Sequence, residues 1–178
     1  MGWIENQMNY AHGSGEGLSN HLIIWKNAGE RKLIRFVYPA SDEYFVCVGN
    51  HFYHDKGYFC PRWEEHVVGG KSWEEVACPI CRATNKRPST RVATYALELD
   101  INNPSVVIKA GIVMQSLTNF WGWFVSSQQI IGPINNFNFF ITRNGTGTAT
   151  NYSVLKDDRN IVPNYSLPNN RFCGCGKR

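Results

Sequence analysis

The stretch "ATYALELDINNPSVVIKAGI", residues 93–112, decides the fold class because it contains two strand patterns joined by a turn. Apolar and polar side chains alternate along residues 93–101, which is the period of a strand with one face toward a core. "NNPS" is typical of a turn, and "VVIKAGI" has the β-branched composition of a second strand. The apolar face comprises Ala93, Tyr95, Leu97, Leu99 and Ile101, and the polar face Thr94, Glu98 and Asp100.

Further strand patterns lie on both sides of this hairpin. Residues 31–39 and 43–49 are β-branched and aromatic runs that end at Pro39 and Gly49. Residues 137–143 and 150–156 form a late hairpin around the glycine-containing turn 144–147. The sequence therefore predicts five to seven strands.

Residues 116–131 predict the main helix. Ser116 or Thr118 can cap its start, and Gly132-Pro133 ends it. The apolar residues that recur at helical spacing are Leu117, Phe120, Trp121, Phe124 and Val125.

With 178 residues, 43% of them hydrophobic, one domain is expected. Few-stranded, mostly antiparallel chains with one helix favour an OB-fold-like five-stranded barrel. We expect a flexible N-terminal segment over residues 1–30, in which Leu22–Trp25 could dock, a core over 31–157, and an extended tail over 158–178. No run of residues is apolar enough to span a membrane, and no signal peptide is evident, so a cytoplasmic protein is expected.

Three cysteines and several histidines predict a zinc site. Cys78 and Cys81 are separated by two residues, which lets both thiolates face one ion, and Cys60 supplies a third. His51, His54 and His66 are all candidates for the fourth ligand. His51 and His54 lie near a hairpin whose turn is expected at residues 55–57.

The remaining cysteines have other expected roles. Cys47 lies in an apolar strand and is expected in the core, whereas Cys173 and Cys175 are expected to be free thiols in the tail. Three cysteines and one histidine leave no open metal position, so the zinc is expected to be structural and the protein not an enzyme. The alternative is a zinc-stabilised nuclease or other phage DNA-processing enzyme.

A basic segment follows the cysteines directly, and aromatic residues are interleaved with it. Four cations without an intervening acid could follow a phosphate backbone, and exposed aromatic rings could stack on bases, as in single-strand binders. The cations are Arg82, Lys86, Arg87 and Arg91, with Arg31, Lys32, Arg35 and Arg143 as an extension. The aromatic candidates are Tyr58, Trp63, Tyr95, Phe139 and Tyr152, while Trp121, Phe124, Phe137 and Phe140 are expected in the core.

These features together resemble the zinc-containing, helix-destabilising single-stranded DNA-binding proteins of tailed bacteriophages. "VCVGNHFYHDKGYFC", "ACPIC" and "NKRPSTRVATYALELDINNP" are similar to that family in type and order, over about residues 31–157. The resemblance implies an OB-fold core with an inserted zinc-binding subdomain at residues 51–82. It implies His51, Cys60, Cys78 and Cys81 as ligands, and Lys86, Arg87, Arg91 and Tyr95 along the DNA cleft.

The resemblance also implies a role and partners. That family coats single strands exposed during replication, recombination and repair, and oligomerisation on DNA and contacts with replication proteins would follow. The family's acidic C-terminal tail has no counterpart here, because this chain ends in the basic "GKR".

Overall fold

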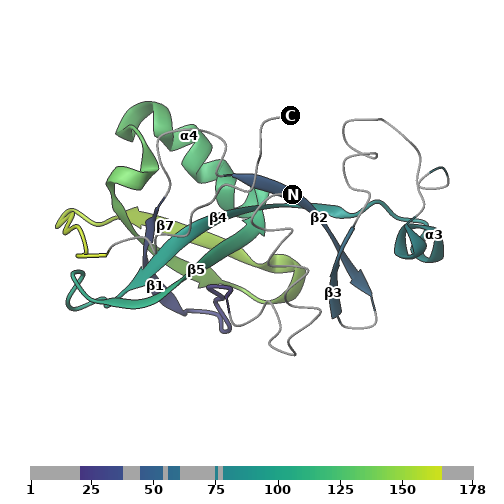
Figure 1. Ribbon diagram of the computed structural model, residues 1–178, viewed down its shortest axis with the longest axis horizontal. Coiled ribbons are helices and arrows are strands. Elements are labelled where there is room, and N and C mark those ends of the chain that lie inside the picture. Colours follow the sequence, from purple (N-terminus) through teal and green to yellow (C-terminus); the bar gives the residue numbers. More distant parts are fainter. Residues whose placement is uncertain (1–20, 38–44, 54–55, 61–74, 76–77, 166–178) are drawn as a thin grey trace, which may run out of the picture.

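The computed structural model describes residues 21–37, 45–53, 56–60, 75 and 78–165. These residues form one antiparallel sheet, with the main helical region above it in the view of Figure 1 and a short helix beyond one end. The strands are β1 (Arg31–Phe36), β2 (Val46–Tyr53), β3 (Lys56–Phe59), β4 (Ser89–Leu99), β5 (Val107–Ser116), β6 (Asn138–Asn144) and β7 (Asn151–Lys156). The helical segments are α3 (Pro79–Thr84), the π-helical Leu117–Trp121, α4 (Gly122–Ile131) and the 3-10 turns Ile134–Asn136 and Gly147–Ala149.

The long strand β4 organises the sheet. Its N-terminal half pairs with β2 and its C-terminal half with β1, while β5 pairs along most of its other edge. β1 pairs with β6, and β6 with β7, so the order is β3-β2-β4-β1-β6-β7 with β5 attached to β4. Residues 93–112 therefore form the antiparallel pair that the sequence predicts.

The predicted closed five-stranded barrel is not formed. β5 and β7 lie at the ends of the curled sheet, and within the described residues no backbone pairing joins them. A side-chain hydrogen bond bridges them, since the Tyr152 hydroxyl donates to Gln115 Oε1 at 3.2 Å. The fold is mostly β and its sheet is antiparallel, as predicted, but the sheet is open.

The N-terminal segment occupies the open side of the sheet. Its backbone forms a parallel bridge to β5, with Ile23 N donating to Ile112 O and Ile112 N to His21 O, both at 2.8 Å. The Trp25 indole then donates to Ile141 O on β6 at 3.0 Å. Residues 21–30, expected to be flexible, are thus part of the fold, while residues 1–20 lie outside the described part.

The inner face of the sheet carries the main core. Ile23 and Trp25 belong to it, each only 2% exposed. Because Trp25 packs against Phe120 and Tyr152, the N-terminal segment, the helical region and β7 share one apolar cluster. Its buried members are Ile23, Trp25, Ile34, Phe36, Val92, Ala96, Val113, Phe120, Trp121, Phe124, Ile134, Phe139 and Ile141.

The predicted helix over residues 116–131 is confirmed, but its first turn is π-helical. The Ser116 side chain caps it by accepting a hydrogen bond from Asn119 N at 3.2 Å. Gly132 ends it with a φ of 81°, a conformation that glycine adopts without strain. Leu117 and Val125, included in the predicted apolar stripe, are exposed.

The outer face of β4 is also covered. Leu33, Leu97 and Leu99 form a second buried cluster there, with Tyr95 and Phe140 packed against it. The polar face predicted for residues 93–101 is wrong at Thr94, which is buried on the inner side. A strand in the middle of this sheet has both faces buried, and simple alternation does not describe it.

The C-terminal part of the described chain crosses this outer face. Asn138 Nδ2 donates to Ile161 O at 2.7 Å, and the hydroxyls of Tyr95 and Tyr165 lie 3.4 Å apart. Residues 158–165 of the expected tail are therefore held against the sheet, and residues 166–178 lie outside the described part. No described helix has the length and apolar character needed to cross a bilayer.

Candidate metal centre and basic surface

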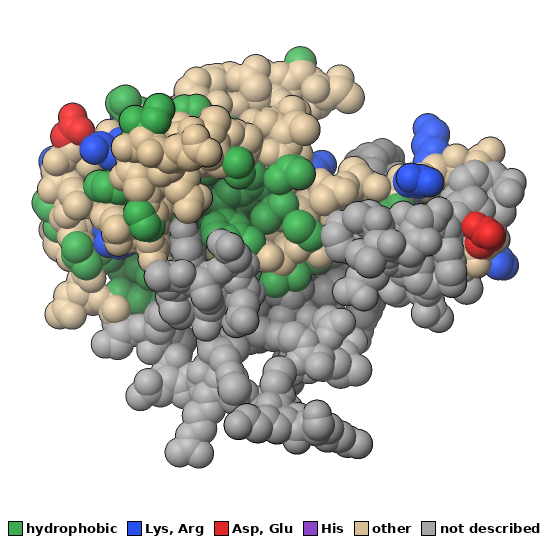
Figure 2. All heavy atoms as spheres, turned by 90° about the horizontal axis from the view of Figure 1, so that it is seen from above, with side chains coloured by type: hydrophobic (Ala, Val, Ile, Leu, Met, Phe, Trp, Pro, Cys, Tyr) green, Lys and Arg blue, Asp and Glu red, His purple; other side chains and the backbone are tan. Residues whose placement is uncertain are grey.

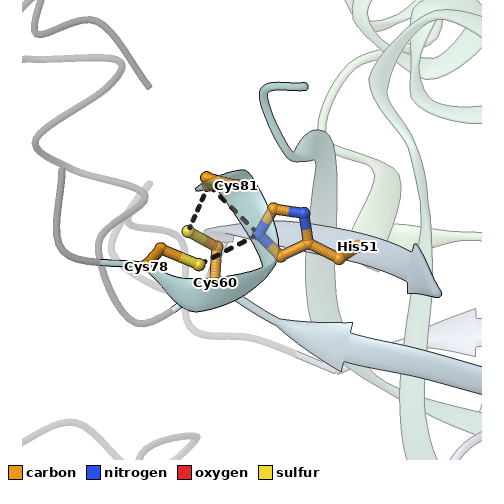
Figure 3. Close-up of side chains that lie close together, drawn as sticks. All are labelled: His51, Cys60, Cys78 and Cys81. Atoms are coloured by element: carbon orange, nitrogen blue, oxygen red, sulfur yellow. Dashed lines mark hydrogen bonds between the residues drawn. The ribbon is translucent and has the colours of Figure 1, made fainter. Parts of the chain in front are cut away.

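Four side chains from three separate elements meet at one buried point. His51, Cys60, Cys78 and Cys81 each offer one ligand atom, and these atoms all lie within 4.8 Å of one another. All four residues are buried, and Figure 3 shows their side chains converging. The group has the composition and compactness of a metal site.

The β2–β3 hairpin provides the first two members. His51 on β2 is paired with Tyr58 on β3, and Lys56 and Gly57, which were expected in the turn, already belong to β3. Cys60 N donates to Gly49 O at 2.9 Å, which keeps the chain beside β2 after β3 has ended. The hairpin therefore brings Cys60 next to His51.

The N-terminus of α3 provides the other two members. Cys78 is the N-cap residue, and Pro79 follows at the first helical position, where its fixed φ suits the helix. Arg82 N donates to Cys78 O at 3.1 Å and closes the first turn. Cys78 and Cys81 thus face the same side of one helical turn.

The distances match the edges of a tetrahedron. Cys60 Sγ lies 3.9 Å from Cys81 Sγ, and His51 Nε2 lies 3.5 Å from Cys78 Sγ and 3.4 Å from Cys81 Sγ. Zinc bonds of about 2.3 Å to sulfur and about 2.0–2.1 Å to nitrogen give tetrahedral edges of roughly 3.8 Å between sulfurs and roughly 3.6 Å between sulfur and nitrogen. These three distances are close to such edges, and the group could hold a metal such as zinc.

The thiols differ in acidity when no metal compensates their charge. Burial, together with the neighbouring Cys78 and Cys60 sulfurs, raises the pKa of Cys81 to about 12. Burial alone would also raise the pKa of Cys78, but hydrogen bonds from Cys81 N and Ile80 N lower it below the ordinary 9.0. Several buried thiolates together require a cation, since a metal ligand must be deprotonated.

Of the three candidate histidines, His51 lies with the cysteines, and His54 and His66 lie outside the described residues. Cys47 does not lie in the core as expected, because its side chain on β2 is exposed. β2 is an edge strand at this position, so an apolar neighbourhood in sequence does not bury it. Cys173 and Cys175 also lie outside the described residues.

The predicted cations begin immediately beyond the candidate metal ligands. Arg82 on α3 and Lys86 and Arg87 in the link to β4 are exposed, and Arg91 on β4 is half-buried. Within the described part of the chain, no acidic side chain forms an ion pair with any of them. Figure 2 shows basic side chains at the α3 end of the molecule, beyond the main body of the sheet.

Two predicted nucleic-acid contacts lie on the outer face instead. Arg35 on β1 is half-buried and donates to Asn138 Oδ1 at 3.0 Å. Tyr95 packs against the outer cluster with its hydroxyl beside that of Tyr165, and burial raises its pKa. The C-terminal segment thus lies over this face.

Two more predicted contacts point inward. The Arg143 guanidinium donates to the main-chain oxygens of Trp25 and Lys26, both at 2.8 Å, and so holds the N-terminal segment. Tyr152 packs in the main core and reaches Gln115. Phe139, suggested as a stacking surface, is fully buried, so that prediction is wrong. Period-two patterns do not tell which face of a curled sheet is inside.

The other predicted residues are placed as follows. Tyr58 is 40% exposed, directly opposite His51 on the hairpin, and Trp63 lies outside the described residues. Trp121 and Phe124 are in the main core as predicted, with Phe137 partly buried against it, and Phe140 packs on the outer cluster.

Sequence reasoning missed Asn85. It ends α3 in the left-handed conformation, with a φ of 54°, and turns the chain toward Lys86 and Arg87. Asparagine is the residue other than glycine that most often takes this position, so the signal was its place directly after the short helix. Asn85 therefore sets the direction of the basic link.

No protein-family model, curated protein or solved structure matches this chain.

Proposed function

We propose that this chain is a single-stranded DNA-binding protein with a structural zinc ion, acting without enzymatic chemistry. The single observation that carries the proposal is the run of cations attached to the buried Cys3His group, which form no ion pair with any acidic residue in the described part of the chain. Unpaired cations on a fixed scaffold can neutralise phosphates and release their counterions, which is the main source of affinity for nucleic acid.

The metal site would fix these cations in space. Arg82 directly follows Cys81, so its main chain is held by the ligand. Lys86 and Arg87 are only a few residues from α3 on one side and β4 on the other, and Ser89 Oγ donates to Asn50 O at 2.9 Å on the ligand-bearing strand. A fixed cationic surface loses less conformational entropy on binding than a mobile one.

The surroundings favour an unpaired strand. Tyr58 is exposed on the hairpin of the metal centre and offers a ring on which a base can stack, at about 1–3 kcal/mol per base. Stacking on a ring requires a base that is free of its partner strand. The resemblance to helix-destabilising phage proteins points in the same direction and supports a role in coating strands during replication, recombination and repair.

The four ligands support a structural rather than a catalytic ion. Catalytic zinc keeps one position for water or substrate, whereas three sulfurs and one nitrogen complete the tetrahedron. Zinc in such a site contributes directly to folding.

A salt titration of binding to oligo(dT) with two matched variants tests the proposal. Lys86 lies in the basic link, and Lys26 is an exposed lysine on the N-terminal segment. Lys86→Gln should weaken binding and reduce the slope of log K against log salt by about 0.7, the value for one lost phosphate contact on a single strand. Lys26→Gln should leave the slope unchanged.

Three results would overturn the proposal. Affinity that is absent, or that does not change with salt, removes nucleic-acid binding. Equal effects of the two lysine variants remove the basic link as the binding surface. Metal-dependent cleavage of the oligonucleotide would favour a nuclease instead.

A further inference from the structure

Two cysteine sulfurs of the metal group lie close enough to react with each other. Cys60 Sγ is 3.9 Å from Cys81 Sγ, and a dashed line marks this contact in Figure 3. A disulfide bond is about 2.0 Å long, so the two sulfurs need to approach by only about 1.9 Å to form one. The Cys78 sulfur instead lies 3.5 Å from His51 Nε2.

The two close cysteines belong to different elements. Cys60 directly follows β3 of the hairpin, and Cys81 lies in α3, 21 residues further along the chain. A bond between them ties the hairpin to α3, which are the two elements that a bound metal ion would join. Cys78 and Cys81 lie on one helical turn, so a bond between those two adds no tie to the hairpin. The choice of partner therefore decides what oxidation does to the structure.

The metal group can open without disturbing the sheet. Cys60, Cys78 and Cys81 form a buried cluster of their own, separate from the two clusters of the sheet. A small separate cluster opens at a lower free energy than the main core does. Cys60 is 7% exposed, whereas Cys78 is 1% and Cys81 0% exposed. We therefore expect a small reagent to reach Cys60 first.

We propose that Cys60 and Cys81 are a redox modification site. When the chain holds no metal, the two cysteines form a disulfide that replaces the ion as the link between the hairpin and α3. Closing a loop of this length removes conformational freedom from the open state, which stabilises the closed one. This inference goes beyond the proposed function, and it rests on the positions of the cysteines rather than on nucleic-acid binding.

The oxidant is a low-molecular-weight disulfide, R–S–S–R. The Cys60 thiolate attacks one sulfur of the reagent, releases one R–S⁻ and becomes a mixed disulfide. The Cys81 thiolate then attacks Cys60 Sγ and releases the second R–S⁻. This second step is intramolecular, so it is favoured over attack by another molecule. In total the two cysteines lose two protons and two electrons, and the reagent is reduced to two thiols.

Metal and disulfide exclude each other at this site. Zinc is bound by thiolates, and the sulfurs of a disulfide carry no charge, so the oxidised group has lost two of its four candidate ligands. A bound ion in turn occupies both sulfurs and protects them from the reagent. The oxidised chain should therefore contain far less than one zinc per chain, and the zinc-loaded chain should resist oxidation.

Peptide mapping and hydrogen exchange test the proposal. The purified chain is stripped of metal by a chelator under reducing conditions and then treated with oxidised glutathione. Mass spectrometry of a proteolytic digest should show a Cys60–Cys81 cross-link as the main product within the group. Hydrogen exchange should then show α3 and β3 protected as in the zinc-loaded chain, and dithiothreitol should reverse both changes. The zinc-loaded chain, treated in the same way, should form no such cross-link.

Matched variants locate the reactive pair. Cys78→Ser and Cys60→Ser each remove one candidate metal ligand. Cys78→Ser retains the proposed pair, so oxidation should restore the protection of α3 and β3. In Cys60→Ser the group can pair only Cys78 with Cys81, so oxidation should leave the hairpin unprotected. Cys47→Ser removes an exposed thiol outside the group and should behave like the wild type.

Four results would overturn the proposal. These are the absence of any cross-link within the group, a Cys78–Cys81 cross-link as the main product, equal restoration of protection in Cys60→Ser and Cys78→Ser, and oxidation of the zinc-loaded chain as fast as that of the metal-free chain. None of these measurements involves nucleic acid. A failure of oligo(dT) binding would therefore remove the proposed function and leave this result as it is.

Discussion

His51 and Cys81 are 30 residues apart in sequence, yet His51 Nε2 lies 3.4 Å from Cys81 Sγ. The contact joins β2, which pairs with β4, to α3, which leads into β4. The metal group thus closes a loop that begins and ends at the same central strand. We expect the orientation of the basic link between α3 and β4 to depend on this closure.

Metal removal should unfold the metal subdomain and leave the sheet intact. The three cysteines form an apolar cluster separate from the main core, so loss of their shared ion does not open that core. Hydrogen exchange measured with and without a strong zinc chelator should show lost protection in α3 and β3. Amides of β4 and β5 should stay protected. Loss of protection in all strands together would contradict this separation.

Exchanging a single ligand should abolish stoichiometric metal binding. Cys81→Ser replaces a buried thiolate by a hydroxyl, a far weaker zinc ligand, and elemental analysis should then show far less than one zinc per chain. Cys47→Ser is the matched control, because Cys47 is exposed and does not belong to the ligand group. Full zinc content in Cys81→Ser would show that the ligand set is wrong.

Two glycines should respond to alanine in opposite directions. A Cβ at Gly111 would collide with the main-chain oxygen of His21, where the N-terminal segment pairs with β5. Gly111→Ala should therefore destabilise the fold by about 1–3 kcal/mol. A Cβ at Gly122 would meet nothing closer than 3.6 Å, so Gly122→Ala should stabilise α4 by about 0.5–1 kcal/mol. Urea unfolding measures both, and equal signs would contradict the placement of the segment.

Trp25 should stabilise the fold as a core residue although it precedes the first strand. Trp25→Ala should lower the free energy of unfolding by about 3–5 kcal/mol, the usual cost of removing a buried tryptophan. Trp25→Phe keeps an aromatic ring but removes the hydrogen bond to Ile141 O, so a smaller loss is expected. Ile24→Ala is the control, because Ile24 is adjacent to Trp25 in the sequence but its side chain is 41% exposed. Equal losses for Trp25→Ala and Ile24→Ala would mean that the segment does not contribute to the core.

Protonation of Glu30 should lower the stability of the fold at acidic pH. Burial alone would raise the pKa of Glu30, but hydrogen bonds from Asn27 N and Lys32 lower it below the ordinary 4.5. A carboxyl group whose pKa is lowered on folding stabilises the folded state above pH 4.5. This contribution to stability is lost as the pH falls through the pKa of the folded state. In Glu30→Gln, the temperature of thermal unfolding should fall less steeply at acidic pH than it does in the wild type. An unchanged acid limb would contradict the contribution of this group.

Lys32, in the same ion-pair network, should contribute a pH dependence of stability in the opposite direction. Burial alone would lower the pKa of Lys32, but Glu98 and Glu30, at 2.7 and 3.0 Å, raise it above 10.5. This contribution is complete below pH 10.5 and is lost as the pH rises through the folded value. Lys32→Met should remove the loss at alkaline pH, which the same thermal measurements show. If Lys32→Met still loses stability at alkaline pH as the wild type does, another group is responsible for that loss.

The sequence allowed the metal group and most strands to be predicted because both follow short-range rules. A two-residue spacing brings Cys78 and Cys81 onto one turn whatever the rest of the chain does. Alternation identified β4, and glycine and proline marked the end of α4. The choice among the three histidines required the resemblance, since spacing alone allowed each of them.

The sequence did not show which face of the curled sheet is buried. Phe139 and Phe140 are neighbours with equal composition signals, yet one lies in the main core and the other on the outer cluster. The place of the N-terminal segment in the core was equally hidden, because it depends on Trp25 reaching Ile141, a contact across 116 residues. Long-range packing of this kind leaves no local pattern.

The most direct test of the central claim compares oligo(dT) binding by the zinc-loaded and the metal-free protein at several salt concentrations. If the ion fixes the cations of α3 and the basic link, removing it should lower the affinity and reduce the salt slope while the β4 and β5 amides stay protected. Equal affinity and equal slope in both forms, with the metal confirmed absent from one, would contradict the claim that the metal centre organises the binding surface.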